Sequence, residues 1–150
     1  MRIIPDTTTL PSTPTTDILI LPGGAPGAAT FAADAGVQRL IRAYRGGGRA
    51  TAFICAATTA LAASVAGADN KDGEAARRVR VTSHPAVKEQ LVAAGWEYAP
   101  DAERVVVDGG VITSRGPGTA LLFALTIVEV LCGAAKREEV AGPLICASEL

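Results

Sequence analysis

Short apolar runs of strand length alternate along this chain with segments of helical period. The run at residues 17–21 ends in Pro22, Gly23 and Gly24, which is typical of a buried strand that opens into a tight turn. Residues 35–44 repeat apolar side chains at helical spacing, and residues 50–54 form the next apolar run. This alternation predicts an α/β fold with a largely parallel sheet.

The second half of the chain continues the pattern and adds a hairpin. Asp108-Gly109-Gly110 separates two valine-rich runs, which is the turn chemistry of two antiparallel strands. The polar stretch 67–78 shows no periodicity and predicts an exposed loop. The same signals predict a helix from Ala56, a strand at 79–81, a helix at 86–94, the hairpin strands 105–107 and 111–113, a long helix capped by Thr119 and ending near Gly133, and a short helix at 136–140.

Length and composition limit the classes of protein to consider. The 150 residues suit one domain. A net charge of −1 gives no reason to expect nucleic-acid binding, and the apolar stretch 120–132 falls short of the roughly 20 residues of a membrane span. The first residues lack the apolar core of a signal peptide, so we expect a cytoplasmic protein, with the nucleus as a second location. The three cysteines form no Cys-x-x-Cys pair, so neither a disulfide framework nor a metal site is expected.

Cys55 is the residue whose position says most about chemistry. It lies where the apolar run 50–54 meets a stretch of small residues that can begin a helix. A strand-to-helix turn can hold a side chain clear of the sheet, at the positive end of a helix dipole where a thiolate is favoured. Cys55 is therefore a candidate nucleophile. The alternative is a plain buried cysteine that packs as a small hydrophobe.

Two further loops are expected to lie beside Cys55. Loops at the carboxyl ends of parallel strands surround the ligand crevice of an open α/β sheet, and both Gly23-Gly24 and His84 follow predicted strands. Together they supply a thiol, an imidazole that can exchange protons, and glycine amides that can approach an oxyanion. Taken singly, His84, the only histidine, could instead cap a helix or lie on the surface, and the two glycines could form an ordinary turn.

Four motifs resemble, in order, those of the DJ-1/PfpI superfamily, and within it the branch of the Parkinson-associated protein deglycase and glyoxalase III. The resemblance extends from about Ile3 to Leu144 and implies a flavodoxin-like three-layer α/β/α sandwich with a mostly parallel sheet. The motifs are residues 17–24 (DILILPGG), 53–56 (FICA), 81–85 (VTSHP) and 113–119 (TSRGPGT).

The resemblance also implies roles for individual residues. Cys55 corresponds to the oxidation-sensitive nucleophile and His84 to its neighbour in the pocket. The amides of Gly24 and Ala56 correspond to the oxyanion-binding pair, with Gly23 beside them. Pro143 matches a residue that reaches the pocket of the partner subunit in family dimers, so a homodimer is expected.

The sequence departs from the family pattern at two places. Family members begin with a βαβ segment that carries a central strand, a dimer-interface helix and a glutamate that hydrogen-bonds the thiol. That segment is missing from this sequence and no residue matches the glutamate by motif, so we expect a sheet that is incomplete at its N-terminal side and an activity that lacks its usual acid/base. The length of the chain still predicts a single domain, residues 1–150. The stretch 67–78 is longer than its family counterpart, and we interpret it as a tolerated loop insertion.

The activity implied by the resemblance is that of glyoxalase III, the glutathione-independent conversion of methylglyoxal to D-lactate, also described as D-lactate dehydratase. Glyoxal is a related substrate, and protein deglycase activity a related reaction. No metal or organic cofactor is implied.

Other functions remain open from the sequence. One is a non-catalytic redox sensor or chaperone in which Cys55 cycles through oxidised sulfur acids. A PfpI-like peptidase or a class I glutaminase-type domain would share the cysteine turn, but the glutaminase expects a late His-x-Glu pair that His84 does not supply. An inactive truncated product is the last alternative.

Overall fold

A four-stranded mixed sheet forms the centre of the molecule, which is described by a computed structural model over residues 4–66 and 73–146. The strands are β1 (Ile18–Leu21), β2 (Ala50–Ile54), β5 (Val105–Asp108) and β6 (Val111–Ser114), in the order β1-β2-β6-β5. β1, β2 and β6 are parallel, and β5 is antiparallel to β6. The sheet is therefore mostly parallel, as the sequence predicts.

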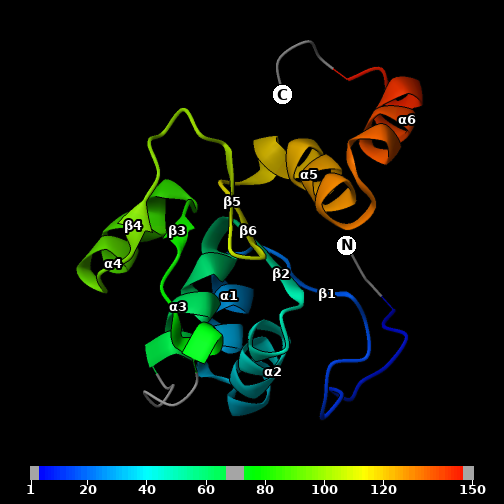
Figure 1. The fold of residues 1–150 in the computed structure, drawn as a ribbon. Helices are drawn as coiled ribbons and strands as arrows, with labels where there is room; N and C mark the ends of the chain where they lie inside the picture. The colour runs from blue at the N-terminus through cyan, green and yellow to red at the C-terminus, as the bar shows by residue number, and fades with distance from the viewer. Residues whose placement is uncertain (1–3, 67–72, 147–150) are drawn as a thin grey trace.

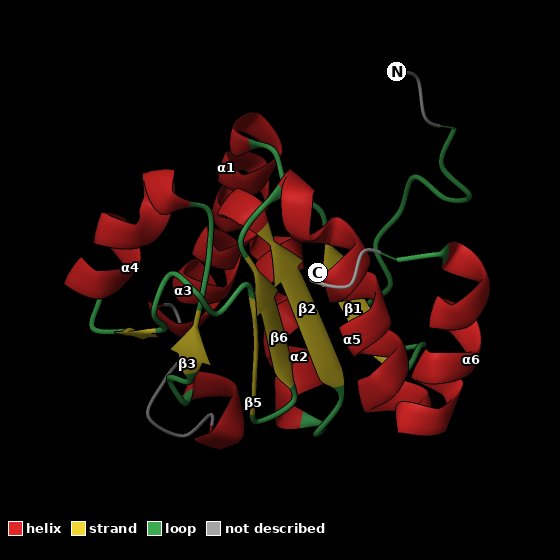
Figure 2. Ribbon diagram, turned by 90° about the horizontal axis from the view of Figure 1, so that it is seen from above, coloured by secondary structure: helices red, strands yellow, loops and turns green. Residues whose placement is uncertain are grey.

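Helices cover both faces of this sheet (Figures 1 and 2). Phe53 and Val111 face a core built with α1 (Ala25–Ala33), α2 (Ala35–Gly46) and α3 (Thr58–Ala66). The alternate residues of the same strands point the other way, because successive side chains of a strand face opposite sides. Ala52 and Ile112 thus pack against Phe123 and Ile127 of α5 (Ala120–Cys132). The result is a three-layer α/β/α sandwich.

A smaller unit adjoins the main sheet on one side (Figure 1). β3 (Arg80–Val81) and β4 (Glu97–Tyr98) form a two-stranded parallel sheet. The chain between them makes a 3₁₀ turn, Pro85–Val87, and then α4 (Lys88–Ala93). Leu91 and Trp96 are buried in the same core as Phe53. Through these two buried side chains, the unit and its His84 loop are attached to the main core.

The C-terminal helix α6 (Ala134–Leu144) packs on α5 and has no buried residue. A hydrogen-bonded ion pair of 2.6 Å joins Arg137 to Glu129 of α5. No helix in the described ranges combines the length and apolarity that a membrane crossing requires.

Most elements agree with the sequence predictions, and the differences have local causes. α1 was not expected, because Pro22 to Gly27 resembles a loop, yet Pro26 occupies a first-turn position that tolerates proline. β4 was also missed, since two residues are too few to show a period. The predicted helix 86–94 is a 3₁₀ turn followed by α4, and α6 extends beyond 136–140. Within the predicted loop 67–78, residues 67–72 lie outside the described residues and Gly73–Ala76 form a 3₁₀ turn.

Two isoleucines on the α5 side of the sheet make a matched test of this architecture. Ile112 of β6 is fully buried, whereas Ile20 of β1 is 47% exposed. We expect Ile112→Ala to lower the free energy of unfolding by about 3 kcal/mol, because it leaves a cavity under α5. Ile20→Ala should cost under about 1 kcal/mol. Urea denaturation measures both, and equal losses would show that the face at β1 is covered in solution.

Candidate functional site

The backbone turns sharply at Cys55, between the last residue of β2 and a 3₁₀ turn, Cys55–Ala57, that leads into α3. Its φ of 66° lies in the left-handed region, which among the described non-glycine residues only Ile145 shares. That conformation costs an L-residue roughly 1–2 kcal/mol. Cys55 is half-buried and not in a disulfide. The turn therefore holds the sulfur at the end of the sheet, beside the amino end of a helix, as the sequence predicts.

Gly23 lies directly against this turn. β1 and β2 are paired in register with Leu21 opposite Phe53, so the segments that follow them leave the sheet side by side. A Cβ atom placed on Gly23 would be 2.7 Å from the Cβ of Cys55 and 3.4 Å from its Sγ. Only a residue without a side chain fits there. Gly24, next along the chain, has a φ of 105° and occupies the N-cap of α1.

The His84 loop meets the Cys55 turn through the backbone. The amide N–H of His84 donates to the carbonyl oxygen of Cys55 at 3.2 Å. The imidazole is exposed, and its Nδ1 accepts a 3.2 Å hydrogen bond from the amide of Ala86, which caps the 3₁₀ turn. Because Nδ1 is an acceptor, the neutral ring carries its proton on Nε2. His84 thus both caps a helix and lies beside the cysteine turn, so the two readings of this residue are compatible.

A fourth loop, not expected at the site, borders His84. A Cβ atom placed on Gly116 would lie 3.6 Å from Cδ2 of His84. The loop is held by Thr119, whose Oγ1 accepts from the amide of Gly116 at 3.0 Å and lies 2.6 Å from Oγ of Ser114. Thr119 is the N-cap of α5, as the sequence predicts, although its side chain makes no cap hydrogen bond there. Its hydroxyl stabilises the Gly116 turn instead.

A charged cluster lies beyond these loops. Asp101 contacts Arg115 at 2.9 Å and Lys88 at 3.1 Å. Hydrogen bonds from Arg115 first and Lys88 second lower the pKa of Asp101 below its usual value. The cluster connects the start of α4, which follows His84, to the segment that precedes Gly116. The described residues contain no group of three or more His, Cys, Asp and Glu side chains placed to bind a metal ion.

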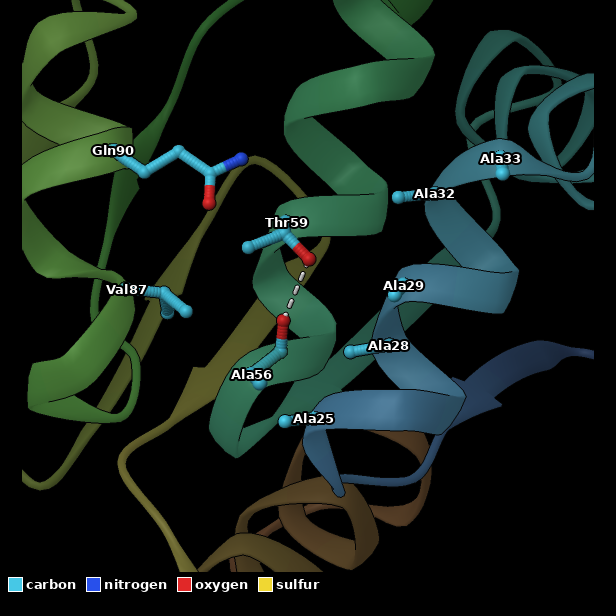
Figure 3. Close-up of a pocket in the computed structure, with 9 residues that line it drawn as sticks. All are labelled: Ala25, Ala28, Ala29, Ala32, Ala33, Ala56, Thr59, Val87 and Gln90. Carbon is cyan, nitrogen blue, oxygen red and sulfur yellow. Dashed lines mark hydrogen bonds between the residues drawn. The ribbon is translucent and has the colours of Figure 1, made fainter.

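An open groove of about 430 Å³ adjoins the cysteine turn (Figure 3). It runs between α1 and α4 across α3, and Ala56 lies at its floor, whereas Cys55 and His84 are not among its lining residues. Thr59 bonds its hydroxyl to the carbonyl of Ala56 at 2.8 Å, and Gln90 of α4 directs its amide across the groove. The walls are mostly alanine: Ala25, Ala28, Ala29, Ala32 and Ala33 of α1.

Comparison with known proteins decides the family of this chain. The family model described as "DJ-1/PfpI family" matches residues 1–130. The chain belongs to the DJ-1/PfpI family.

Two relatives and one solved structure show how far this DJ-1/PfpI protein resembles known proteins. "Protein dj-1beta" of Drosophila melanogaster is 41% identical over 98% of this chain and 73% of its own length. "Glutathione-independent glyoxalase DJR-1.2" of Caenorhabditis elegans is 37% identical over 97% of this chain and 72% of its own. The crystal structure of Drosophila melanogaster DJ-1beta aligns with a TM-score of 0.75 and 43% identity, covering 87% of this chain and 64% of that one. The chain thus spans about two thirds of that solved relative.

The structure brings five of the six predicted site residues together and leaves one apart. Gly23, Gly24, Cys55 and Ala56 adjoin along two neighbouring loops, and His84 touches Cys55 through its amide. Pro143 lies exposed within α6, beyond α5 on the opposite face of the sheet. Sequence reasoning missed Gly116, although it stands within the quoted TSRGPGT motif, and it missed Tyr98, whose hydroxyl holds the residue before His84.

The contact between Gly23 and Cys55 predicts a local effect on the thiol. Gly23→Ala places a methyl group against the cysteine side chain, so we expect slower alkylation of Cys55 by iodoacetamide and a loss of about 1–3 kcal/mol in stability. Peptide mass spectrometry measures labelling at Cys55 alone. Gly27→Ala in α1 is the matched control, because nothing lies within 4 Å of its added Cβ. Equal labelling of both variants and the wild type would contradict the contact.

Proposed function

We propose that this protein is a glutathione-independent glyoxalase that converts methylglyoxal to D-lactate with Cys55 as the nucleophile. The observation that carries the proposal is the left-handed turn at Cys55, a half-buried residue whose side chain lies against Gly23 and whose carbonyl oxygen accepts from the amide of His84. Such strain is retained where the geometry of a side chain matters. The reaction class is that named for the Caenorhabditis elegans relative, a glutathione-independent glyoxalase.

The first step of the proposed reaction forms a carbon–sulfur bond. The thiolate of Cys55 adds to the aldehyde carbon of methylglyoxal, and the carbonyl electron pair moves to oxygen, giving a hemithioacetal after protonation. The backbone amides of Gly24 and Ala56 are assigned to this oxyanion. Gly24 follows Gly23, which lies against the side chain of Cys55, and Ala56 follows Cys55 itself. No metal or organic cofactor takes part in this scheme.

The second step moves a proton between neighbouring carbons. The hemithioacetal carbon loses its proton and the adjacent ketone carbon gains one, which gives a lactoyl thioester; water then cleaves the thioester and releases lactate and the free thiol. The sum is one water added to methylglyoxal. No residue of the chain matches the family glutamate by motif, so the proposal assigns proton movement to His84. Its Nδ1 is engaged by Ala86, which makes Nε2 the nitrogen that exchanges protons.

The same proposal includes two finer assignments. Deglycation of early glyoxal adducts on proteins would use the same nucleophile and oxyanion donors. A homodimer would bring Pro143 to the pocket of the partner subunit, and the exposed position of Pro143 in α6 is what such a contact requires.

Production of D-lactate from methylglyoxal without glutathione tests the proposal. We expect the purified chain to form D-lactate, and Cys55→Ala to lower the rate more than about a hundredfold, because the covalent step is lost. Cys132→Ala is the matched control: that cysteine is exposed at the end of α5 and should leave the rate unchanged. Oxidation of Cys55 by peroxide with no D-lactate from the wild type would contradict the proposal and favour the redox sensor.

A further inference from the structure

The position of His84 depends on the two residues before it, Thr82 and Ser83, which follow the end of strand β3. β3 ends at Val81, so Thr82 and Ser83 need other partners for their backbone groups. The amide of Thr82 donates to Oγ1 of Thr113, and its carbonyl accepts from Oγ1 of Thr58. Those bonds hold Thr82 between β6 and α3, but they do not hold the next residue.

Ser83 is held by the hydroxyl of Tyr98. The amide of Ser83 donates to this oxygen at 3.1 Å, and the hydroxyl donates to the carbonyl of Ser83 at 3.0 Å. The serine Oγ lies 3.1 Å from the same oxygen and 3.0 Å from the carbonyl of His84, to which it donates. Ser83 is fully buried, so water cannot replace these bonds cheaply. One phenol oxygen therefore satisfies both backbone groups of the residue before His84.

Tyr98 is itself fixed by elements around it. β4 pairs with β3 so that Tyr98 stands opposite Val81, and the amide of Ala99 donates to the carbonyl of Val81 at 2.9 Å. The ammonium group of Lys88 lies 5.0 Å from the centre of the phenol ring, within the range of a cation–π contact. The ring is thus held on its backbone side and on one face, which leaves the hydroxyl in one position.

We propose that Tyr98 is a positioning residue for His84, fixing the loop through which the imidazole and the carbonyl of Cys55 are aligned. This inference rests on the proposed function, because it assigns Tyr98 to the same site. The path is short: the Tyr98 hydroxyl binds Ser83, the next amide is that of His84, and this amide binds the carbonyl of Cys55 at 3.2 Å. Removal of the hydroxyl alone should loosen His84 without emptying the core.

The test compares Tyr98→Phe with Tyr44→Phe, the same change at the only other tyrosine. The Tyr44 hydroxyl bonds Thr16 at 2.7 Å, near the start of β1 and away from the site. His84 is the only histidine, so one set of imidazole NMR signals reports on it. We expect Tyr98→Phe to shift or broaden those signals and to lower kcat for D-lactate formation about tenfold with KM within about twofold, as misalignment does. Tyr44→Phe should change neither.

The outcomes separate this inference from the proposed function. A wild type that makes no D-lactate defeats the proposed function, while the imidazole signals of the two variants still test Tyr98. Unchanged signals in Tyr98→Phe, or the same change in both variants, would overturn the inference. Should Tyr98→Phe fail to fold, amide hydrogen exchange in the wild type tests the same bonds: the amides of Ser83 and His84 should exchange slowly, and fast exchange at either would overturn the inference.

Discussion

The left-handed backbone at Cys55 is the constraint on which the site depends. With a φ of 66° the chain turns at the cysteine itself. Gly23 has no side chain and so leaves space for the side chain of Cys55. The cost of that conformation is met by the buried core around β2, where Phe53 and Ala57 on either side of the turn are fully enclosed.

The parallel pairing of the sheet explains why distant segments meet there. β1, β2 and β6 run in the same direction, so the loops after Leu21, Ile54 and Ser114 emerge at one edge. The His84 loop joins them from the smaller sheet, and it is anchored by side-chain hydroxyls instead of a continuous ladder. Polar residues buried beneath the site therefore act as its scaffold: Thr58, Thr82, Ser83, Thr113, Ser114 and Thr119 are all enclosed.

Much of this arrangement could be predicted from the sequence, because the signals were local. The apolar run of β2, the diglycine after β1 and the turn glycines of the β5–β6 hairpin each predict their own structure, and strand order in an α/β fold then places Cys55, Gly23 and His84 at one edge. The parts that could not be predicted depend on contacts distant in sequence. Tyr98 lies in a strand of two residues, and its hydroxyl binds Ser83, fifteen positions earlier in the chain. Thr119 stands at the N-cap of α5, but its hydroxyl accepts from the amide of Gly116 instead of capping that helix.

The free energies of unfolding of Cys55→Ala and Cys55→Gly test the central constraint most directly. Glycine adopts a positive φ without steric cost, whereas alanine does not. The structure therefore predicts that Cys55→Gly is at least as stable as Cys55→Ala, while Ala63→Gly, at a half-buried position in the middle of α3, loses about 1 kcal/mol, the usual cost of glycine in a helix. A Cys55→Gly variant less stable than Cys55→Ala by that same amount would show that the backbone at Cys55 is ordinary, and the account of the site would fail.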